Sequence, residues 1–320
     1  MIKIFKIGHL PYTPFDENFS QKNLVYLNSK GLKVTKFKNE ADIFVAGNHN
    51  SIKKFMLKNP GKKNYLLWTN EPRFSKVNTK TYRPLFLFPK IHVMNVYTGD
   101  VFFNNVAYQQ RRFTETKKLD FIENKFQFLT KRQVALMSFF HGGKYSALWM
   151  NGQNIDLIKK RSEIALYCYN ENRMDIFGQG WPEGISKEDS RMNNRHSRKK
   201  EILKNYHFNF CFENTLYPYY ITEKIWESIE CKCLPIYYGG DTGSIYEIFP
   251  EKSFIDYSQF KNPQEMIIYI ENMTREEFIM RMNKCIKVYN EFVEKPHVYW
   301  EDDYKKRLDN IVHKCKLILN

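Results

Sequence analysis

The chain has 320 residues, of which 42% are hydrophobic and 16% aromatic, and its formal net charge is +15. This composition supplies a large apolar core and excludes a disordered chain, and no apolar run reaches the roughly 20 residues of a membrane-spanning helix. The first residues lack the apolar segment of a signal peptide, which predicts a cytoplasmic protein. The positive charge favours a phosphorylated ligand or an anionic membrane face, and no zinc finger, RNP motif or basic zipper indicates nucleic-acid binding.

The first third of the chain alternates short apolar runs with polar stretches of helical character. Strands are predicted at residues 2–7, 32–37, 42–46 and 65–68, with a helix at 51–58. Pro60 and Gly61 end that helix. This alternation predicts an open parallel sheet with helical crossovers.

A polar and charged stretch, residues 108–125, separates this pattern from a second one and predicts a linker. Beyond it we predict strands at 134–140, 175–177, 207–212 and 234–238, and helices at 155–169 and 222–231. Residues 186–200 are polar, which indicates a mobile segment. The chain is therefore predicted to form two α/β domains, residues 1–125 and 126–299.

The last segment, residues 300–320, has the apolar spacing of an amphipathic helix. Its stripe contains Tyr304, Leu308, Ile311, Cys315 and Ile318, and lysines occupy the other face. One interpretation is that the stripe packs back on the first domain. The other is that the helix lies on an anionic bilayer, which would place the protein at the inner face of the membrane.

Neither the cysteines nor the acidic clusters predict a metal site. None of the six cysteines forms a CxxC pair, and Cys231 and Cys233 are separated by a single residue, so reduced thiols are expected. The triplet Glu301-Asp302-Asp303 precedes the terminal helix and follows no apolar strand, which indicates a charged helix start.

The stretch from Phe212 to Gly240 contains most of the candidate ligand-binding residues. A predicted strand ends at Glu213 and Asn214, an aromatic loop follows, and Thr222-Glu223-Lys224 opens a helix. Ligands of open α/β sheets bind at the carboxyl ends of strands, and a helix N-terminus favours phosphate. Lys224 adds a full charge, and Glu223 can accept hydrogen bonds from ribose hydroxyls, so the spacing suits a nucleotide diphosphate. The alternatives are an ordinary capped helix start and, for Glu213, an internal ion pair at the strand end.

This stretch closely resembles the signature of the α1,3/1,4-fucosyltransferases, glycosyltransferase family 10. The matching positions are Phe208, Phe212, Glu213, Asn214, Tyr220, Ile221, Thr222, Glu223, Lys224, Ile225, Pro235, Ile236 and Gly239. Weaker similarity covers most of the remaining chain. KRQVALMSFF resembles the first donor-domain strand, Arg161 is similar to an arginine that the family places before a strand ending here at Gly178, and LLWTNEPRF resembles an acidic acceptor segment with Glu71 as its carboxylate.

The resemblance implies a GT-B architecture, with two Rossmann-like domains facing across a cleft. The first domain would bind a GlcNAc-containing oligosaccharide or lipid-linked glycan, and the second would bind GDP-fucose. The reaction would be an inverting displacement onto a hydroxyl such as O3 of GlcNAc, with no cofactor and no required metal.

The resemblance also implies the roles of single residues. Glu71 would be the general base, and Arg161 and Lys224 would neutralise the departing GDP. Glu223 would hold the ribose. Glu213, Asn214, Tyr220, Thr222 and Gly178 would complete the donor pocket.

Two other functions fit the residues. A GT-B transferase could use another nucleotide sugar in envelope polysaccharide synthesis, since the phosphate contacts would be shared. A basic non-catalytic protein could bind nucleic acid or anionic glycans. The residues leave the acceptor, the linkage and the oligomeric state open.

Overall fold

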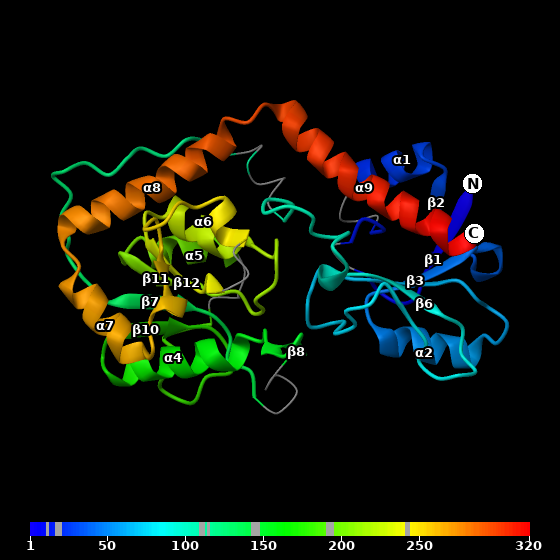
Figure 1. The fold of residues 1–320 in the computed structure, drawn as a ribbon, viewed down its shortest axis with the longest axis horizontal. Helices are drawn as coiled ribbons and strands as arrows, with labels where there is room; N and C mark the ends of the chain where they lie inside the picture. Colours follow the sequence, from blue (N-terminus) through cyan, green and yellow to red (C-terminus); the bar gives the residue numbers. More distant parts are fainter. Residues whose placement is uncertain are drawn as a thin grey trace. The chain divides into compact units, whose positions relative to one another are not determined.

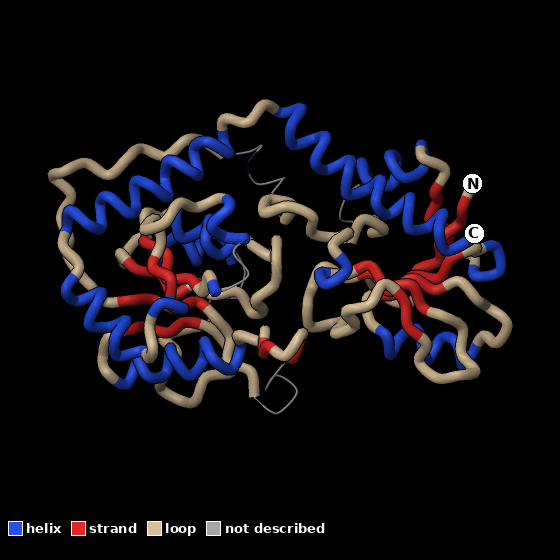
Figure 2. Tube along the Cα trace, viewed as in Figure 1, coloured by secondary structure: helices blue, strands red, loops and turns tan. Residues whose placement is uncertain are grey.

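The computed structural model describes residues 1–10, 13–16, 21–108, 113, 116–141, 148–189, 195–240 and 244–320. The chain forms two compact units (Figure 1). Unit 1 contains Met1–Ala107 and His297–Asn320, and unit 2 contains Tyr108–Pro296. In each unit, helices cover a sheet of mainly parallel strands (Figure 2). The predicted α/β class with two Rossmann-like sheets is confirmed.

The sheet of unit 1 has the order β2-β1-β3-β4-β6-β5. Its strands are β1 (Ile2–Lys6), β2 (Leu32–Thr35), β3 (Ile43–Ala46), β4 (Tyr65–Trp68), β5 (Thr81–Tyr82) and β6 (Ile91–Met94). All neighbours are parallel except β5, which pairs antiparallel with β6 at the edge. Every residue of β3 and β4 is buried, as expected for apolar strands covered on both faces.

Three helices of unit 1 are α1 (Gln21–Ser29), α2 (His49–Lys58) and α9 (His297–Leu319). The side chain of Asn48 caps α2 by accepting a hydrogen bond from the amide of Ser51. Ile52 and Met56 of α2 then pack on the core cluster that includes Phe44. The cap and the apolar spacing together explain why this segment is helical.

The C-terminal helix α9 packs within unit 1 rather than presenting an apolar face to solvent. Leu308, Ile311, Cys315 and Ile318 are all buried, and the Tyr26 hydroxyl of α1 donates a 3.0 Å hydrogen bond to Asp309. The stripe predicted from sequence therefore faces the core and is not available to a bilayer. In the part of the chain that the structure describes, no helix combines the length and apolarity needed to cross a membrane.

The sheet of unit 2 has the order β10-β7-β11-β12-β13, with every neighbouring pair parallel. The strands are β7 (Gln133–Leu136), β10 (Met174–Phe177), β11 (Phe208–Phe210), β12 (Leu234–Tyr237) and β13 (Ile255–Asp256). The helices are α4 (Ile158–Asn170), α5 (Arg195–Leu203), α6 (Glu223–Glu230), α7 (Pro263–Asn272) and α8 (Arg275–Val293). A short ribbon of β8 (Trp149–Met150) and β9 (Gln153–Asn154) precedes α4.

The segment after Tyr108 belongs to unit 2, whereas the sequence predicts a linker there and a boundary near Lys125. Amides of Leu119 and Ile122 donate to Asn290 and Asn283 of α8, at 2.8 and 2.7 Å. In Figure 1 the chain runs alongside α8. Two asparagines thus satisfy backbone amides that have no partner strand and hold residues 119–122 on α8. The two compact units divide between Ala107 and Tyr108.

Candidate functional site

The strand order of unit 2 has one topological switch point. Counted along the chain, the strands lie in the spatial order 2-1-3-4-5, so the crossovers diverge between β7 and β11. Ligands of doubly wound folds bind at the carboxyl ends of the two strands that flank this point. A cavity opens there, lined on the β7 side by Met137 and on the β11 side by Phe212, with Arg161, Lys199 and Lys224 around it.

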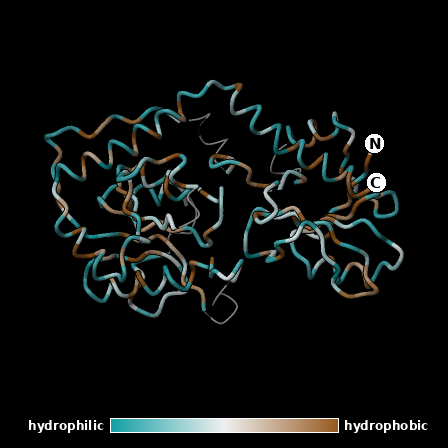
Figure 3. The backbone as a smooth tube through the Cα atoms, in the orientation of Figure 1, coloured by the Kyte–Doolittle hydropathy of each residue, from teal (hydrophilic) through white to brown (hydrophobic). Residues whose placement is uncertain are grey.

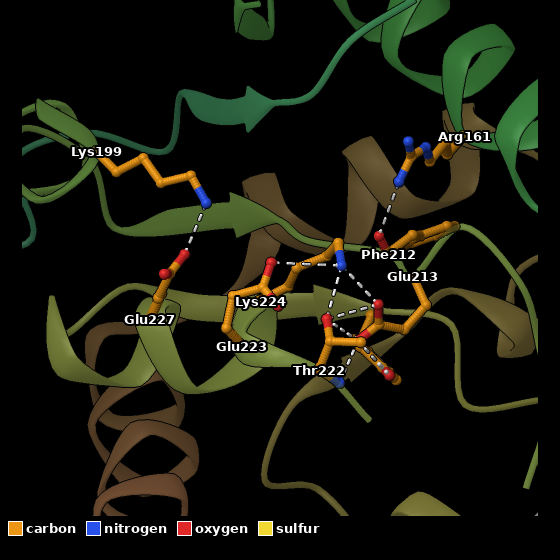
Figure 4. A network of polar contacts seen from close by, with 9 residues as sticks. Arg161, Lys199, Phe212, Glu213, Thr222, Glu223, Lys224 and Glu227 are labelled. Carbon is orange, nitrogen blue, oxygen red and sulfur yellow. Dashed lines mark hydrogen bonds and ion pairs between the residues drawn. The ribbon is translucent and has the colours of Figure 1, made fainter. Parts of the chain in front are cut away.

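The centre of the site is a group formed by Glu213, Thr222 and Lys224 (Figure 4). The Lys224 ammonium lies 2.7 Å from Oε2 of Glu213 and 2.6 Å from the Thr222 hydroxyl. The amide and hydroxyl of Thr222 both donate to the Glu213 carboxylate, at 2.7 and 2.8 Å. Glu213 and Thr222 are almost fully buried, with exposed fractions of 3% and 1%.

The local sequence explains why these three groups meet. Glu213 follows the end of β11, and Thr222 is the N-cap of α6 in an extended conformation. The Thr222 side chain makes no cap hydrogen bond of its own, and the strand-end carboxylate accepts from its amide. A buried carboxylate requires such partners. Glu213 therefore forms an internal ion pair with Lys224 at the strand end.

Both charged groups at the start of α6 are ionised at neutral pH. Burial opposes the charge on Lys224, but the carboxylates of Glu213 and Glu223 outweigh it and raise its pKa. Burial would raise the pKa of Glu223, yet the cations Lys224 and Lys199 lower that pKa to about 2. Lys224 therefore offers a permanent positive charge to the cavity, and Glu223 is a permanent hydrogen-bond acceptor.

Arg161 lies in the first turn of α4, and 6% of it is exposed. Its Nη1 donates to the carbonyl oxygen of Phe212 at 3.3 Å, which ties α4 to the end of β11. The predicted partners Arg161 and Lys224 thus line one cavity from two different helices.

Lys199 lines the same cavity from α5, and the sequence interpretation did not identify it. Its ammonium forms a 2.9 Å ion pair with Glu227 of α6, and the side chains are only 12% and 7% exposed. Lys199 precedes the buried residues Ile202 and Leu203 by three and four positions, so it shares their helix face. The spacing from Ile202 and Leu203 is the only sequence signal for Lys199, and it is weak because charged residues occupy most of α5.

Three other predicted residues of unit 2 lie around the site with partners inside the protein. The backbone carbonyl of Asn214 accepts a hydrogen bond from the backbone amide of Leu157, at the start of α4, at 3.1 Å. Tyr220 is 3% exposed and lines a second small cavity next to Glu213. Gly178 has a φ of +134°, and a Cβ there would lie 2.3 Å from the carbonyl oxygen of Met137. Gly178 therefore permits the close approach of the ends of β10 and β7.

Glu71 belongs to unit 1 and follows the carboxyl end of β4. Its amide donates to the Thr69 hydroxyl at 3.1 Å, and its side chain is half-buried. The loop is held in place by the segment after β6, because the Tyr97 hydroxyl donates to the carbonyl of Pro72 at 2.8 Å and Asn95 donates to Ser75 at 3.1 Å. The loop that carries Glu71 is thus held in place by Asn95 and Tyr97, which follow β6.

Among the described residues, no group of three or more His, Cys, Asp or Glu side chains is arranged to hold a metal ion. The six cysteines are free thiols. The cavity at the switch point is lined by three cations, Arg161, Lys199 and Lys224, each on a different helix, and by the carboxylate of Glu227, which pairs with Lys199.

Comparison with known proteins places these features in a family. The model of the family "Glycosyltransferase family 10 (fucosyltransferase) C-term" matches residues 143–316. Alpha-(1,3)-fucosyltransferase FucT of Helicobacter pylori is 44% identical over 73 residues, which are 23% of this chain and 15% of that protein. The human 4-galactosyl-N-acetylglucosaminide 3-alpha-L-fucosyltransferase FUT6 is 31% identical over 77 residues, 24% of this chain and 21% of that protein.

The matched segments thus span about a fifth or less of these relatives. A solved α1,3-fucosyltransferase aligns over 96% of this chain and 90% of its own with 17% identity and a TM-score of 0.49, and another with GDP-fucose gives 0.45. The family match covers more than half of the chain and includes the whole of the Glu213–Lys224 group. The chain belongs to glycosyltransferase family 10, the fucosyltransferases.

Proposed function

We propose that this protein transfers fucose from GDP-fucose to a hydroxyl of a glycan acceptor, with inversion at the anomeric carbon. The acceptor hydroxyl would be O3 of a GlcNAc residue in an oligosaccharide or lipid-linked glycan. Family membership and the names of the relatives support the transfer of fucose. The observation that carries the proposal is the buried Glu213–Thr222–Lys224 group, which holds a cation at the N-terminus of α6 beside Arg161.

The leaving group sets the first requirement of this reaction. As the bond between the fucose C1 and the β-phosphate oxygen breaks, its electron pair stays on GDP, and the developing charge needs preorganised cations. Arg161 and Lys224 supply them, and we add Lys199 from the same cavity wall. Removing one such group from an active site typically costs about 3 kcal/mol of transition-state stabilisation. Glu213 would position Lys224 without contacting the sugar nucleotide.

The other donor contacts follow from the ionisation of Glu223. Its carboxylate accepts hydrogen bonds from the two ribose hydroxyls while Lys224, 3.7 Å from it, faces the diphosphate. Asn214, Thr222 and Tyr220 surround this pair. Gly178 would act through the packing of β10 on β7.

The acceptor sets the second requirement. An alcohol is a weak nucleophile, so a carboxylate must accept its proton while the new bond from oxygen to C1 forms. Glu71 takes this role in the proposal, because it is a half-buried carboxylate on a braced loop at the carboxyl edge of the sheet of unit 1. In this reaction the proton passes to Glu71, the fucosyl group passes to the acceptor oxygen, and the electron pair of the broken bond stays on GDP. The three cations would make a divalent metal unnecessary.

The proposal is tested by incubating the purified chain with a panel of sugar nucleotides and a glycan array, with and without EDTA, followed by mass spectrometry and linkage analysis. We expect transfer of fucose from GDP-fucose alone, insensitive to EDTA. Turnover of a different sugar nucleotide without turnover of GDP-fucose would support the polysaccharide alternative. Salt-sensitive binding to duplex DNA without any affinity for GDP would refute a transferase.

A further inference from the structure

Unit 1 carries an exposed apolar loop between β5 and β6. Thr81 pairs with His92 and Tyr82 with Ile91, so residues 83–90 form the connection of this antiparallel pair. At its tip, the exposed fractions of Leu85, Phe86 and Leu87 are 66%, 92% and 90%. The tube in Figure 3 is coloured as hydrophobic over this stretch. We refer to Leu85, Phe86 and Leu87 as the apolar tip.

The loop is built to present the apolar tip. The amide of Phe88 donates to the carbonyl of Leu85 at 3.0 Å, and Arg83 Nη1 donates to the carbonyl of Phe88 at 3.4 Å, which closes the turn at its base. Phe88 and Tyr82 pack against the core of unit 1. The base of the loop is therefore anchored, while three consecutive apolar side chains point into solvent, where their exposure is unfavourable.

The charged residues nearest to the apolar tip along the chain are Arg83 and Lys90, which are both basic and exposed. Between Pro72 and Gly99 the sequence contains no Asp or Glu. Two further exposed lysines of this stretch, Lys76 and Lys80, lie toward the other edge of the sheet, because the carbonyl of Lys80 accepts from the amide of Val93 in β6. Basic side chains that flank an apolar segment complement the negative surface of an anionic bilayer, while the apolar side chains enter the boundary between headgroups and acyl chains.

The position of the loop separates it from the candidate acceptor site. β6 runs parallel to β4, so the loop that precedes β6 lies at the amino edge of the sheet, whereas Glu71 follows β4 at the carboxyl edge. The apolar tip therefore does not contribute to the site at Glu71.

We propose that the apolar tip, flanked by Arg83 and Lys90, docks unit 1 on an anionic membrane surface. The loop replaces α9, whose apolar stripe is buried, as the element that contacts the bilayer. This inference does not depend on the proposed transferase activity.

The first test is co-sedimentation of the full chain with vesicles of 70% phosphatidylcholine and 30% phosphatidylserine. Each apolar side chain moved from water into hydrocarbon strengthens binding by about a factor of ten, so Phe86→Ser/Leu87→Ser should weaken binding by at least about tenfold. The matched control is Val25→Ser/Leu57→Ser, which changes residues 68% and 70% exposed on α1 and α2. Equal binding by the loop variant and the wild type, or an equal loss in both double variants, overturns the proposal.

The second test concerns charge. Arg83→Gln/Lys90→Gln should lower binding by about tenfold or more, since each basic residue near an anionic surface contributes about fivefold. Lys54→Gln/Lys58→Gln on α2 removes the same net charge from exposed positions and should have a much smaller effect. Equal losses in these variants would show that only bulk charge matters and would overturn the role of the loop.

The third test uses a variant that reports membrane insertion directly, without weakening binding. Tryptophan fluorescence of Phe86→Trp should shift to the blue on these vesicles and be quenched by brominated lipid, relative to the wild type. No difference from the wild type overturns the proposal. GDP-fucose turnover without vesicles should be unchanged in Phe86→Ser/Leu87→Ser, so a failure of membrane docking and a failure of the proposed activity are distinguishable.

Discussion

The ammonium of Lys224 lies 2.7 Å from the carboxylate of Glu213, a residue with an exposed fraction of only 3%. The carboxylate also accepts from the amide and the hydroxyl of Thr222. A single side chain at a strand end thus caps a helix and fixes the cation that the helix presents. Lys224 keeps its charge and its place before any nucleotide binds, which is the preorganisation that electrostatic catalysis requires.

Glu213→Gln should reduce both stability and turnover. The amide can still accept from Thr222, but it removes the charge that holds Lys224, and hydrogen bonds to buried charged groups contribute about 2 kcal/mol. We expect the free energy of unfolding in urea to fall by about that amount and kcat to fall by about tenfold or more. Glu163→Gln is the control: it breaks the ion pair of Glu163 with Lys159, in which both side chains are 64% exposed. This substitution should change neither the free energy of unfolding nor kcat.

If the diphosphate binds in this cavity as proposed, Lys199→Met should weaken GDP binding by about tenfold, because a largely buried cation of the cavity wall is removed. Lys200→Met is its matched control. Lys200 is the next residue on α5 and is also paired with a glutamate, Glu230, but its side chain is 52% exposed. Isothermal titration with GDP measures both variants. If the two variants bound GDP equally well, Lys199 would have only a structural role.

Glu71→Gln should lower kcat by about 10²-fold or more and leave the Kd for GDP unchanged, since the amide cannot accept the acceptor's proton. Glu40→Gln, an exposed carboxylate of the same unit paired with Lys3, should behave as the wild type. Unchanged turnover in Glu71→Gln would remove Glu71 as the base. A parallel loss of GDP affinity would point to misfolding instead.

Gly178→Ala should be far more destabilising than Gly184→Ala. Both glycines have positive φ, +134° and +80°, but a Cβ at Gly178 would meet the Met137 carbonyl oxygen at 2.3 Å, whereas a Cβ at Gly184 would meet nothing within 4 Å. We expect a loss of about 1 kcal/mol at Gly184 from backbone strain and about 3 kcal/mol or more at Gly178, measured by urea unfolding. Full stability with lost GDP binding in Gly178→Ala would instead assign Gly178 to the ligand.

Glu223 should contribute to the acid sensitivity of the fold. Its pKa in the folded protein is about 2, below the usual value of 4.5, because the opposing effect of burial is exceeded by Lys224 and Lys199. The stabilisation is therefore fully present above pH 4.5 and is lost as the pH falls from 4.5 toward 2. The difference in unfolding free energy between wild type and Glu223→Gln should shrink by up to about 3 kcal/mol over that range. A difference that is independent of pH would contradict the assigned pKa.

The sequence was informative where the site is contiguous. Glu213, Thr222 and Lys224 lie within twelve residues, and a strand end followed by a capped helix start determines where they meet. It was less informative for α5, where the run RHSRKKEIL has so many charges that Lys199 is not distinguished from its solvent-exposed neighbours. From sequence alone, a lysine is predicted to be exposed to solvent. The burial of Lys199 depends on its ion pair with Glu227 on another helix, which the sequence does not reveal.

Two features of the fold could not be predicted for related reasons. The helix α1 buries only Asn23 and Leu27, so its sequence has almost no apolar periodicity. The described residues 116–132 form no helix or strand, and they are held in unit 2 by Asn283 and Asn290, which are more than 160 positions away in the chain. Partners so distant leave no local pattern.

The return of α9 to unit 1 has a consequence for biosynthesis. Unit 2 is one uninterrupted stretch, Tyr108–Pro296, whereas unit 1 needs both Met1–Ala107 and His297–Asn320. On the ribosome unit 2 can therefore reach its native state while unit 1 still lacks the helix that covers α1. The half of the protein that is translated first is the half that finishes folding last.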